Sequence, residues 1–251
     1  MRKQMIWILA LSTAIAVGVS AVALAAGEKP TVVQAGNLVL TLNGGVSPKA
    51  LPRTKLAPIS VHFSGRIATV DGSQPPALSN FSIDTGKTGA IDTKGIAVCS
   101  RGKIEATTTQ SAEAACRGAI VGRGSTEVRV AFPESTPFTA KGPLVIFNGG
   151  TQGGKTLILI HAYVAVPAPT AIVETITVTK EHKGLYNLRA AGPIPPIAGG
   201  SGSVTAFDLT INRKDYLMAS CLGGQFFAHV VASFRDGAEI SGNLTRPCKE
   251  I

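Results

Sequence analysis

The most recognisable chemical pattern lies in Gly149 to Thr156, GGTQGGKT, which fits the phosphate-binding pattern of a glycine, four residues and then Gly-Lys-Thr. In nucleotide-binding proteins this loop follows a buried strand and opens a helix, whose free N–H groups bind phosphate. Here the next residues, Leu157 to Val166, are rich in leucine, isoleucine and valine, and Pro167 follows. A short β-branched run that ends at proline predicts a strand. We therefore expect a hairpin between Leu144 to Asn148 and Leu157 to Val166, and no nucleotide site.

Three short fragments match motifs of penicillin-binding enzymes: Ser100-x-x-Lys103, Ser241-x-Asn243 and Lys87-Thr88-Gly89. In those enzymes the serine begins a helix and the motifs run in the order just given. In this chain the Lys-Thr-Gly fragment comes first and long helices are missing, so we interpret the matches as coincidence. The serine-hydrolase elbow has only one weak candidate, Gly200-Ser201-Gly202, which lacks the outer glycine and lies in a connector.

Histidines and carboxylates in expected strands are the remaining candidates for acid-base or metal chemistry. They are His62, His161, His229, Glu127, Glu174 and Asp208. No pair of histidines has the i, i+2 or i, i+4 spacing of a local metal site. Alternation along the strands predicts that the carboxylates face outward, which disfavours a glycosidase pair. We therefore assign no catalytic residue, no cofactor-binding residue, no cofactor and no metal ligand.

The first 25 residues have the layout of a secretory signal. Arg2 and Lys3 precede an apolar run from Ile6 to Leu24 that ends in Ala23-Leu24-Ala25. The small-x-small ending predicts cleavage between Ala25 and Gly27, although a retained membrane anchor is the alternative reading. Later apolar runs are all interrupted, so no further membrane span is expected. The sequence therefore predicts a secreted or cell-envelope protein.

Charge is spread evenly along the chain. The net charge is +9, and removal of Arg2 and Lys3 leaves 22 basic and 15 acidic residues, or +7. Nucleic-acid recognition needs a basic stripe or an aromatic stacking platform, and neither is visible, so no nucleic-acid partner is expected. Weak attraction to anionic cell-envelope polymers is compatible with this charge. We expect a monomer, and the sequence identifies no partner.

Four cysteines in an exported chain predict two disulfides. We expect Cys99 to pair with Cys116, because one ends a strand and the other ends the single expected helix, Thr109 to Cys116. We expect Cys221 to pair with Cys248, because both reach the same end of the strand Gln225 to Phe234. In a flat sheet these two cysteines would lie about 9.6 Å apart, beyond disulfide reach, so the chain must bend at Gly223-Gly224 or the strands must lie in different layers.

Short alternating segments bounded by turn residues run through the whole chain, which indicates an all-β protein. The expected strands lie at 31–42 (a hairpin), 59–70, 78–83, 96–99, 103–107, 126–132, 144–148, 157–166, 172–179, 184–189, 204–211, 215–221, 225–234 and 238–246. Proline- and glycine-rich connectors at 48–58 and 190–203 and a loop at 84–95 separate them. We predict an antiparallel β-sandwich, with a jelly-roll-like variant, and one short helix. The expected organisation is a signal peptide (1–25), an N-terminal hairpin with a proline-rich connector (26–58) and the sandwich domain (59–251), with a subdivision near residue 140 left open.

Several segments together resemble an uncharacterised group of exported actinobacterial all-β proteins. They are the leader, CRGAIVGRG, FNGG, the VPAP and IPPIAGG connectors, and the stretch from SCLGGQFF to LTRPC. The resemblance covers about Leu51 to Cys248 and implies export and an all-β body, but no activity. We expect an exported binding or structural protein of the cell envelope or extracellular space. The alternative is a secreted hydrolase whose site is assembled from residues distant in sequence.

Overall fold

The computed structural model describes residues 28–165 and 168–251, and the expected signal segment, 1–25, lies outside these residues. The strands are β1 (Thr31–Ala35), β2 (Leu38–Ser47), β3 (Ala50–Leu51), β4 (Ala57–Thr69), β5 (Leu78–Gly86), β6 (Gly89–Ile91), β7 (Ile120–Val130), β8 (Phe138–Gln152), β9 (Lys155–Val164), β10 (Thr170–Lys183), β11 (Tyr186–Pro193), β12 (Gly202–Ile211), β13 (Leu217–Ala219), β14 (Gln225–Phe234), β15 (Glu239–Pro247) and β16 (Lys249–Glu250). The helices are α1 (Arg101–Ile104), α2 (Thr109–Ala115), and the 3₁₀ turns η1 (Arg117–Ala119) and η2 (Ala198–Gly200).

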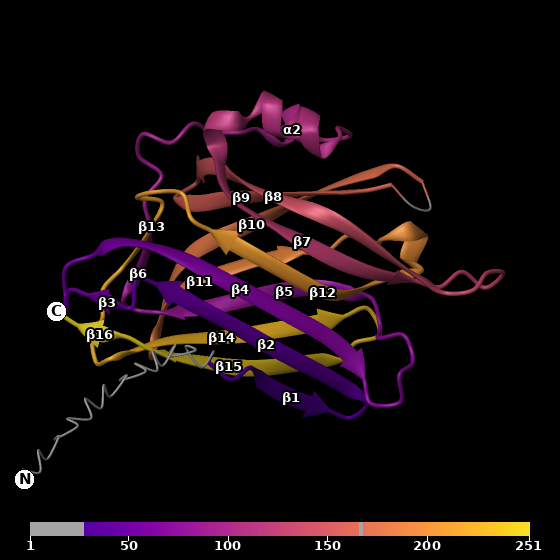
Figure 1. Cartoon of the computed structure of the whole chain (residues 1–251), viewed down its shortest axis with the longest axis horizontal. Coiled ribbons are helices and arrows are strands. Elements are labelled where there is room, and N and C mark those ends of the chain that lie inside the picture. Colours follow the sequence, from indigo (N-terminus) through magenta and orange to yellow (C-terminus); the bar gives the residue numbers. More distant parts are fainter. Residues whose placement is uncertain (1–27, 166–167) are drawn as a thin grey trace, which may run out of the picture.

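Most strands belong to one antiparallel sheet that curls almost into a closed barrel (Figure 1). Its strand order is β1-β2-β4-β12-β7-β8-β9-β10-β11-β5-β14-β15. The all-β antiparallel class predicted from the alternation is confirmed. The hairpin expected around GGTQGGKT is the β8–β9 hairpin, whose turn residues Gly153 and Gly154 have φ values of 56° and 76°. Such left-handed conformations in a two-residue turn suit glycine best.

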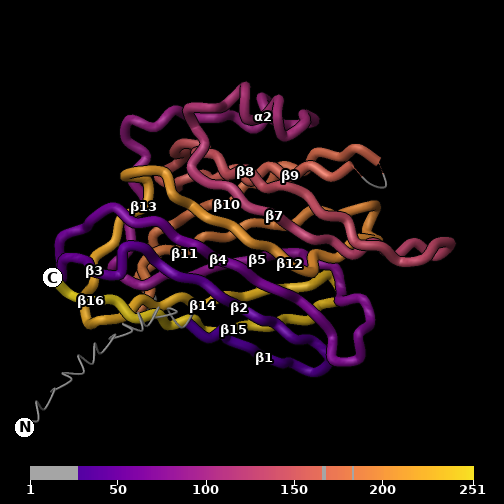
Figure 2. Tube along the Cα trace, in the orientation of Figure 1, coloured from indigo at the N-terminus to yellow at the C-terminus, as the bar shows by residue number. Residues whose placement is uncertain are grey.

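The two ends of the sheet overlap instead of joining. Strands β14 and β15 lie against β1, β2 and β4, so yellow and indigo segments are neighbours in Figure 2. A packed core fills this overlap, with Leu40, Leu42, Val230 and Ala232 fully buried. No strand pairing joins β15 to β1 or β2 within the described residues. The expected sandwich therefore exists locally, as two layers formed by opposite ends of one sheet.

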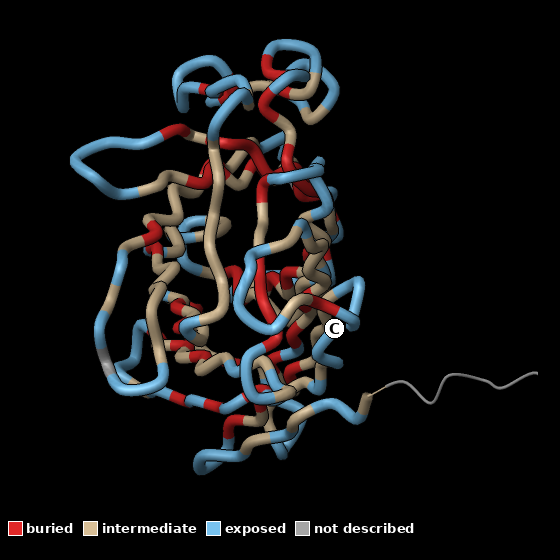
Figure 3. The backbone as a smooth tube through the Cα atoms, turned by 90° about the vertical axis from the view of Figure 1, so that its left-hand side faces the viewer, coloured by how far each residue is buried: buried red, intermediate tan, exposed pale blue. Residues whose placement is uncertain are grey.

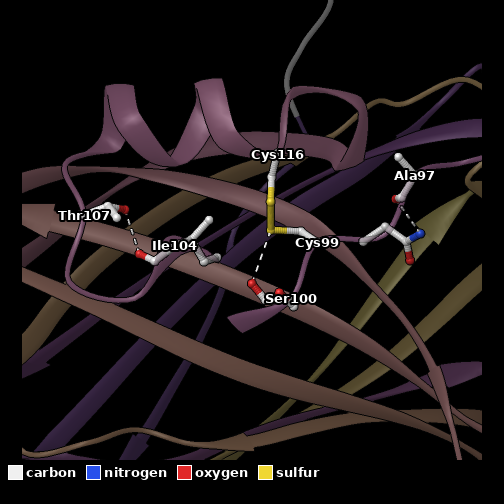
Figure 4. The surroundings of a disulfide bond; sticks show 7 residues. Ala97, Cys99, Ser100, Ile104, Thr107 and Cys116 are labelled. Carbon is white, nitrogen blue, oxygen red and sulfur yellow. Dashed lines mark hydrogen bonds between the residues drawn. A yellow bond between two sulfur atoms is a disulfide. The ribbon is translucent and has the colours of Figure 1, made fainter. Parts of the chain in front are cut away.

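The helical segment, which comprises α1, α2 and η1, covers the outer face of β8, β9 and β10 (Figure 3, top). The Cys99–Cys116 disulfide closes this segment, with Cα atoms 5.5 Å apart, and lies under α2 (Figure 4). Ile104 is completely buried in the core beneath it. Thr107 Oγ1 donates a hydrogen bond to the Ile104 carbonyl (2.8 Å), and Thr108 Oγ1 accepts one from the Ser111 N–H (3.2 Å), so the helical turns are capped.

This segment corrects one sequence expectation. Strands were expected at 96–99 and 103–107, but 101–104 form the single-turn helix α1 and neither range contains a strand. The segment makes only an isolated backbone bond to the sheet, from Cys99 N–H to the Asn148 carbonyl (2.9 Å). Because the segment packs on the face of the sheet through Ile104 and Ala112, away from a strand edge, it forms no strand ladder. The expected helix is confirmed as α2.

The second disulfide, Cys221–Cys248, closes the end of the barrel near the C-terminus. Its Cα atoms lie 5.9 Å apart. Strand β13 pairs with β4 and with β6, which lies inside the segment expected to be a loop at 84–95. Cys221 therefore does not flank β14 in a flat sheet. The chain bends at Gly223 and Gly224, with φ values of 81° and 73°, and the Cys248 N–H donates to the Gly224 carbonyl (2.9 Å). Both disulfides have the pairing expected from the sequence.

Among the described residues, no helix is long and apolar enough to span a bilayer.

Candidate functional site

Alternation along β9 and β10 divides each strand between two apolar environments. Leu159 and Val173 point outward into the core beneath the helical segment. Ile160 and Ile172, one residue along, point into the interior of the barrel. The same strand therefore contributes one face to a packed core and the other to the inside of the curled sheet.

The interior contains a large apolar cavity of about 640 Å³. Its walls come from β2, β4, β5, β7 to β12, β14 and β15, and they consist mainly of isoleucine, valine, leucine, alanine and phenylalanine side chains. Several of these aliphatic side chains, including Ile83, Ile160, Ile172 and Ile176, are only half buried although they point inward. Ile160 and Ile176 pack on one side against the cluster around Ile158 and Val178, and their remaining surface lines the cavity.

Strand number explains why the interior is not filled. A barrel of about eight strands has an interior that its own side chains just fill or that holds one small ligand, and the diameter grows with each added strand. The path of this sheet contains more strands than that, so a wider interior is expected. A cluster that includes Ile158, Val178 and Tyr216 packs closely in part of this interior. The packed overlap between the sheet ends reduces the space on one side, and the remainder is the cavity.

Short segments lie at both ends of the cavity. Ala90, Ile91, Leu217 and Met218, from the β6–β13 pair, line it at the end closed by the second disulfide. At the opposite end the proline-rich stretch Ile194–Ala198, which follows β11, contributes to the lining. The sequence suggests only a connector for this stretch. In the structure it is part of the cavity wall.

Glu174 is the acidic side chain of this wall. It lies on β10 between Ile172 and Ile176, and it pairs in register with Ile160 of β9. Burial raises the pKa of its carboxyl from 4.5 to about 7, and the nearby Arg101 guanidinium and the Thr175 N–H oppose part of this increase. The sequence expectation that Glu174 faces outward is wrong. The face of β10 that carries Glu174 lines the cavity, and the opposite face is covered by the helical segment. In the alternation of β10, Glu174 falls on the same face as Ile172, Ile176 and Val178, and this is the sequence feature that indicates an apolar environment.

The other charged groups along the cavity have protein partners. Arg246 donates through Nε to the Gly44 carbonyl (2.6 Å) and lies 2.7 Å from a Glu28 carboxylate oxygen. Its Nη2 donates to Asn43 Oδ1 (3.0 Å). His62 borders the cavity but directs its Nε2 to Asp208 on the outer face (2.8 Å).

The outer face of β2, β4, β12 and β7 carries a shallow groove of about 360 Å³ that includes Glu127 and Asp208. The Glu127 carboxylate pairs with Lys141 (2.6 Å), which lowers its pKa. Asp208 and His62 form their hydrogen bond in an exposed position, with side-chain exposures of 57% and 43%. In a hydrolase triad the histidine bonds a carboxylate through one ring nitrogen and a serine hydroxyl through the other. His62 has the carboxylate partner, Asp208, but within the described residues no serine hydroxyl bonds to it.

The three strand histidines lie on three different strands and do not come together. His161 is fully buried beneath the helical segment, where its Nε2 lies 3.0 Å from the Thr107 carbonyl. Burial lowers the pKa of His161, which favours the neutral imidazole. His229 Nδ1 lies 2.8 Å from Asn243 Oδ1 on the neighbouring strand. The described residues contain no group of three potential metal ligands.

The remaining motif matches also fall on separate elements. Ser100 and Lys103 lie at α1 on the outside of β8 to β10, in the middle of the strand order, whereas Ser241 lies on β15 at one end of it. Lys87 lies between β5 and β6. Lys155 begins strand β9, so no helix presents N–H groups to a phosphate at GGTQGGKT. The hairpin reading of that motif is confirmed.

Comparison with known proteins gave no relative: no family model, no curated protein and no solved structure matches this chain.

Proposed function

We propose that this chain is an exported binding protein that holds one predominantly aliphatic molecule inside the curled sheet. The observation that supports the proposal is the apolar cavity of about 640 Å³. This volume lies within the range of about 300 to 1,000 Å³ that is common for small-molecule sites. Export remains an inference from the leader, and the two disulfides are consistent with it.

The lining favours a flexible aliphatic ligand over a flat aromatic one. The walls formed by β8 to β11 are made of branched aliphatic residues such as Ile146, Ile158, Ile176 and Leu188. These four strands offer the cavity no aromatic plane for stacking. The phenylalanines Phe63, Phe81 and Phe207 of the lining lie on β4, β5 and β12, where their rings pack against one another. An apolar chain that enters would remove the half-buried faces of these side chains from water, and each buried methylene would contribute about 0.8 kcal/mol.

A hydrolase is supported less well by the geometry. A deep pocket with converging polar residues would indicate an enzyme. The cavity is deep, but its walls are mainly aliphatic. The His62–Asp208 pair, in contrast, lies on an exposed face. We therefore retain binding as the function.

The proposal can be tested with N-phenyl-1-naphthylamine, a neutral apolar probe whose fluorescence increases in apolar surroundings. Purified, oxidised protein should give a saturable signal with one site per chain, and decanol should displace the probe competitively.

Two adjacent alanines of β11 offer a matched pair of variants. Ala190 lines the cavity, whereas Ala191 alternates to the other face of the strand. Ala190→Leu should weaken probe binding and Ala191→Leu should not. Absence of saturable binding in the wild-type protein, or equal effects of the two variants, would refute the proposal.

A further inference from the structure

The carboxylate of Glu174 lies in an aliphatic wall, where the Thr175 N–H is its backbone donor. In the described part of the chain it has no side-chain hydrogen bond or ion pair. Its neighbours on β10 are Ile172 and Ile176, and its register partner on β9 is Ile160. The segment after β11 contributes Ile194 to the same lining. A polar group in such surroundings is costly unless it gains a partner. Glu174 is therefore a place in the cavity where a ligand's polar group would be stabilised.

Arg101 lowers the pKa of Glu174 from outside the wall, but the two form no ion pair in the described part of the chain. Arg101 of α1 lies on the outer side, where its Nε donates to Glu105 (2.9 Å) and its Nη1 lies 3.4 Å from Thr175 Oγ1. His161 of β9 also points outward, and its lowered pKa favours the neutral form. Among the described lining residues the groups that can carry charge are Glu174, Arg246 and His62. The latter two already have carboxylate partners.

This distribution of charge discriminates between head groups. A ligand carboxylate inside the cavity would meet an acidic group and no unengaged cation. A ligand ammonium would form a charge-assisted hydrogen bond with Glu174, which is among the stronger polar contacts in a water-poor site. An alcohol would make a neutral hydrogen bond of intermediate strength. The alkyl chain would contact the same aliphatic walls in all three cases.

We propose that Glu174 is the specificity-determining residue of the cavity and selects an aliphatic amine over an aliphatic acid of equal length. The inference rests on the proposed binding function.

Three ten-carbon compounds test it: decylamine, decanol and decanoate, each used to displace N-phenyl-1-naphthylamine at pH 8. The wild-type protein should bind decylamine at least about tenfold more tightly than decanoate. Glu174→Gln keeps the size of the side chain and removes the charge, so it should weaken decylamine binding about tenfold and leave decanol nearly unchanged. Glu127→Gln, on the outer face, is the matched control and should change none of the three affinities.

The outcomes separate the two proposals. If decanol and the probe bind but decanoate binds as well as decylamine, or Glu174→Gln retains the preference for the amine, the selectivity of Glu174 is refuted and the binding function stands. If neither the probe nor any compound binds, the binding function itself is refuted. Should Glu174→Gln fail to fold, the wild-type protein at pH 5.5 provides the second measurement. Protonation of Glu174 should then reduce the preference for the amine, and an unchanged preference would refute the inference.

Discussion

Replacing Ala190 by leucine should stabilise the ligand-free protein, which is the opposite of the usual effect of enlarging an interior side chain. Ala190 lines the cavity and lies in register with Val178 of β10 and Ile83 of β5. Leucine adds three carbon atoms, which would contribute up to about 2.4 kcal/mol at about 0.8 kcal/mol each if they were fully buried. Loss of rotamer freedom and incomplete contact reduce this, so we expect a gain of about 1 to 2 kcal/mol in the free energy of unfolding.

The matched control is Ala232→Leu. Ala232 is fully buried in the packed overlap between the sheet ends, so added carbon atoms there must displace neighbours. Overpacking of this kind costs about 1 to 3 kcal/mol. Urea unfolding of oxidised protein, followed by circular dichroism, measures both changes. If Ala190→Leu destabilises the protein as much as Ala232→Leu does, the interior is closely packed in solution and the reasoning about the cavity is wrong.

Further measurements test other parts of the structure. Because folding raises the pKa of Glu174 from 4.5 to about 7, the folded state binds this proton more tightly, and stability should fall as pH rises from about 4.5 through 7. Glu174→Gln should reduce the difference in the free energy of unfolding between pH 5 and pH 8.5 by on the order of 1 kcal/mol, because this carboxyl is half exposed. Urea titrations at the two pH values measure it, and an unchanged difference would contradict the placement of Glu174 in the cavity wall. Cys221→Ser should lower the free energy of unfolding by about 3.5 kcal/mol, from the chain entropy of its 27-residue span, and no loss on urea unfolding would argue against that pairing. Lys155→Ala should leave stability unchanged, and calorimetric titration with Mg-ATP should show no saturable binding in either protein. Gly124→Ala should lower the melting temperature because its Cβ would collide with a carbonyl oxygen of β12; a melting temperature equal to that of the wild type would show that the two strands lie further apart.

Local features of the fold could be predicted from the sequence. The β8–β9 hairpin follows from two apolar runs around a glycine-rich turn, and the α2 helix and both disulfides follow from features close together in the chain. Strand order could not be predicted, because it depends on pairings between distant segments. For example, β5 pairs with β11 and β14, and β12 pairs with β4 and β7. The number of strands joined by these pairings sets the circumference of the sheet and, with the overlap of its ends, the space left for the cavity.

Glu174 shows the same limit at a single residue. Alternation correctly separates Ile172, Glu174 and Ile176 from Val173, but it does not reveal what covers each face. A strand is usually assumed to have one face in the core and one face in solvent. This assumption fails on β10, because the helical segment covers its outer face and the barrel encloses its inner face. The carboxylate was therefore assigned to solvent when it belongs to the cavity wall.

The overlap between the sheet ends has a mechanical consequence. Hydrogen bonds between neighbouring strands set a fixed spacing, so a barrel closed by them has a fixed girth. Here the closing contacts are side-chain contacts, such as the approach of Gly242 on β15 to Val33 on β1 and Leu42 on β2. Arg246 of β15 also donates hydrogen bonds to Gly44 and Asn43 of β2, but no ladder of backbone hydrogen bonds fixes the separation of these two surfaces. The girth of this barrel is therefore set by side-chain packing in the overlap, whereas hydrogen bonds set the spacing of the strands within the sheet.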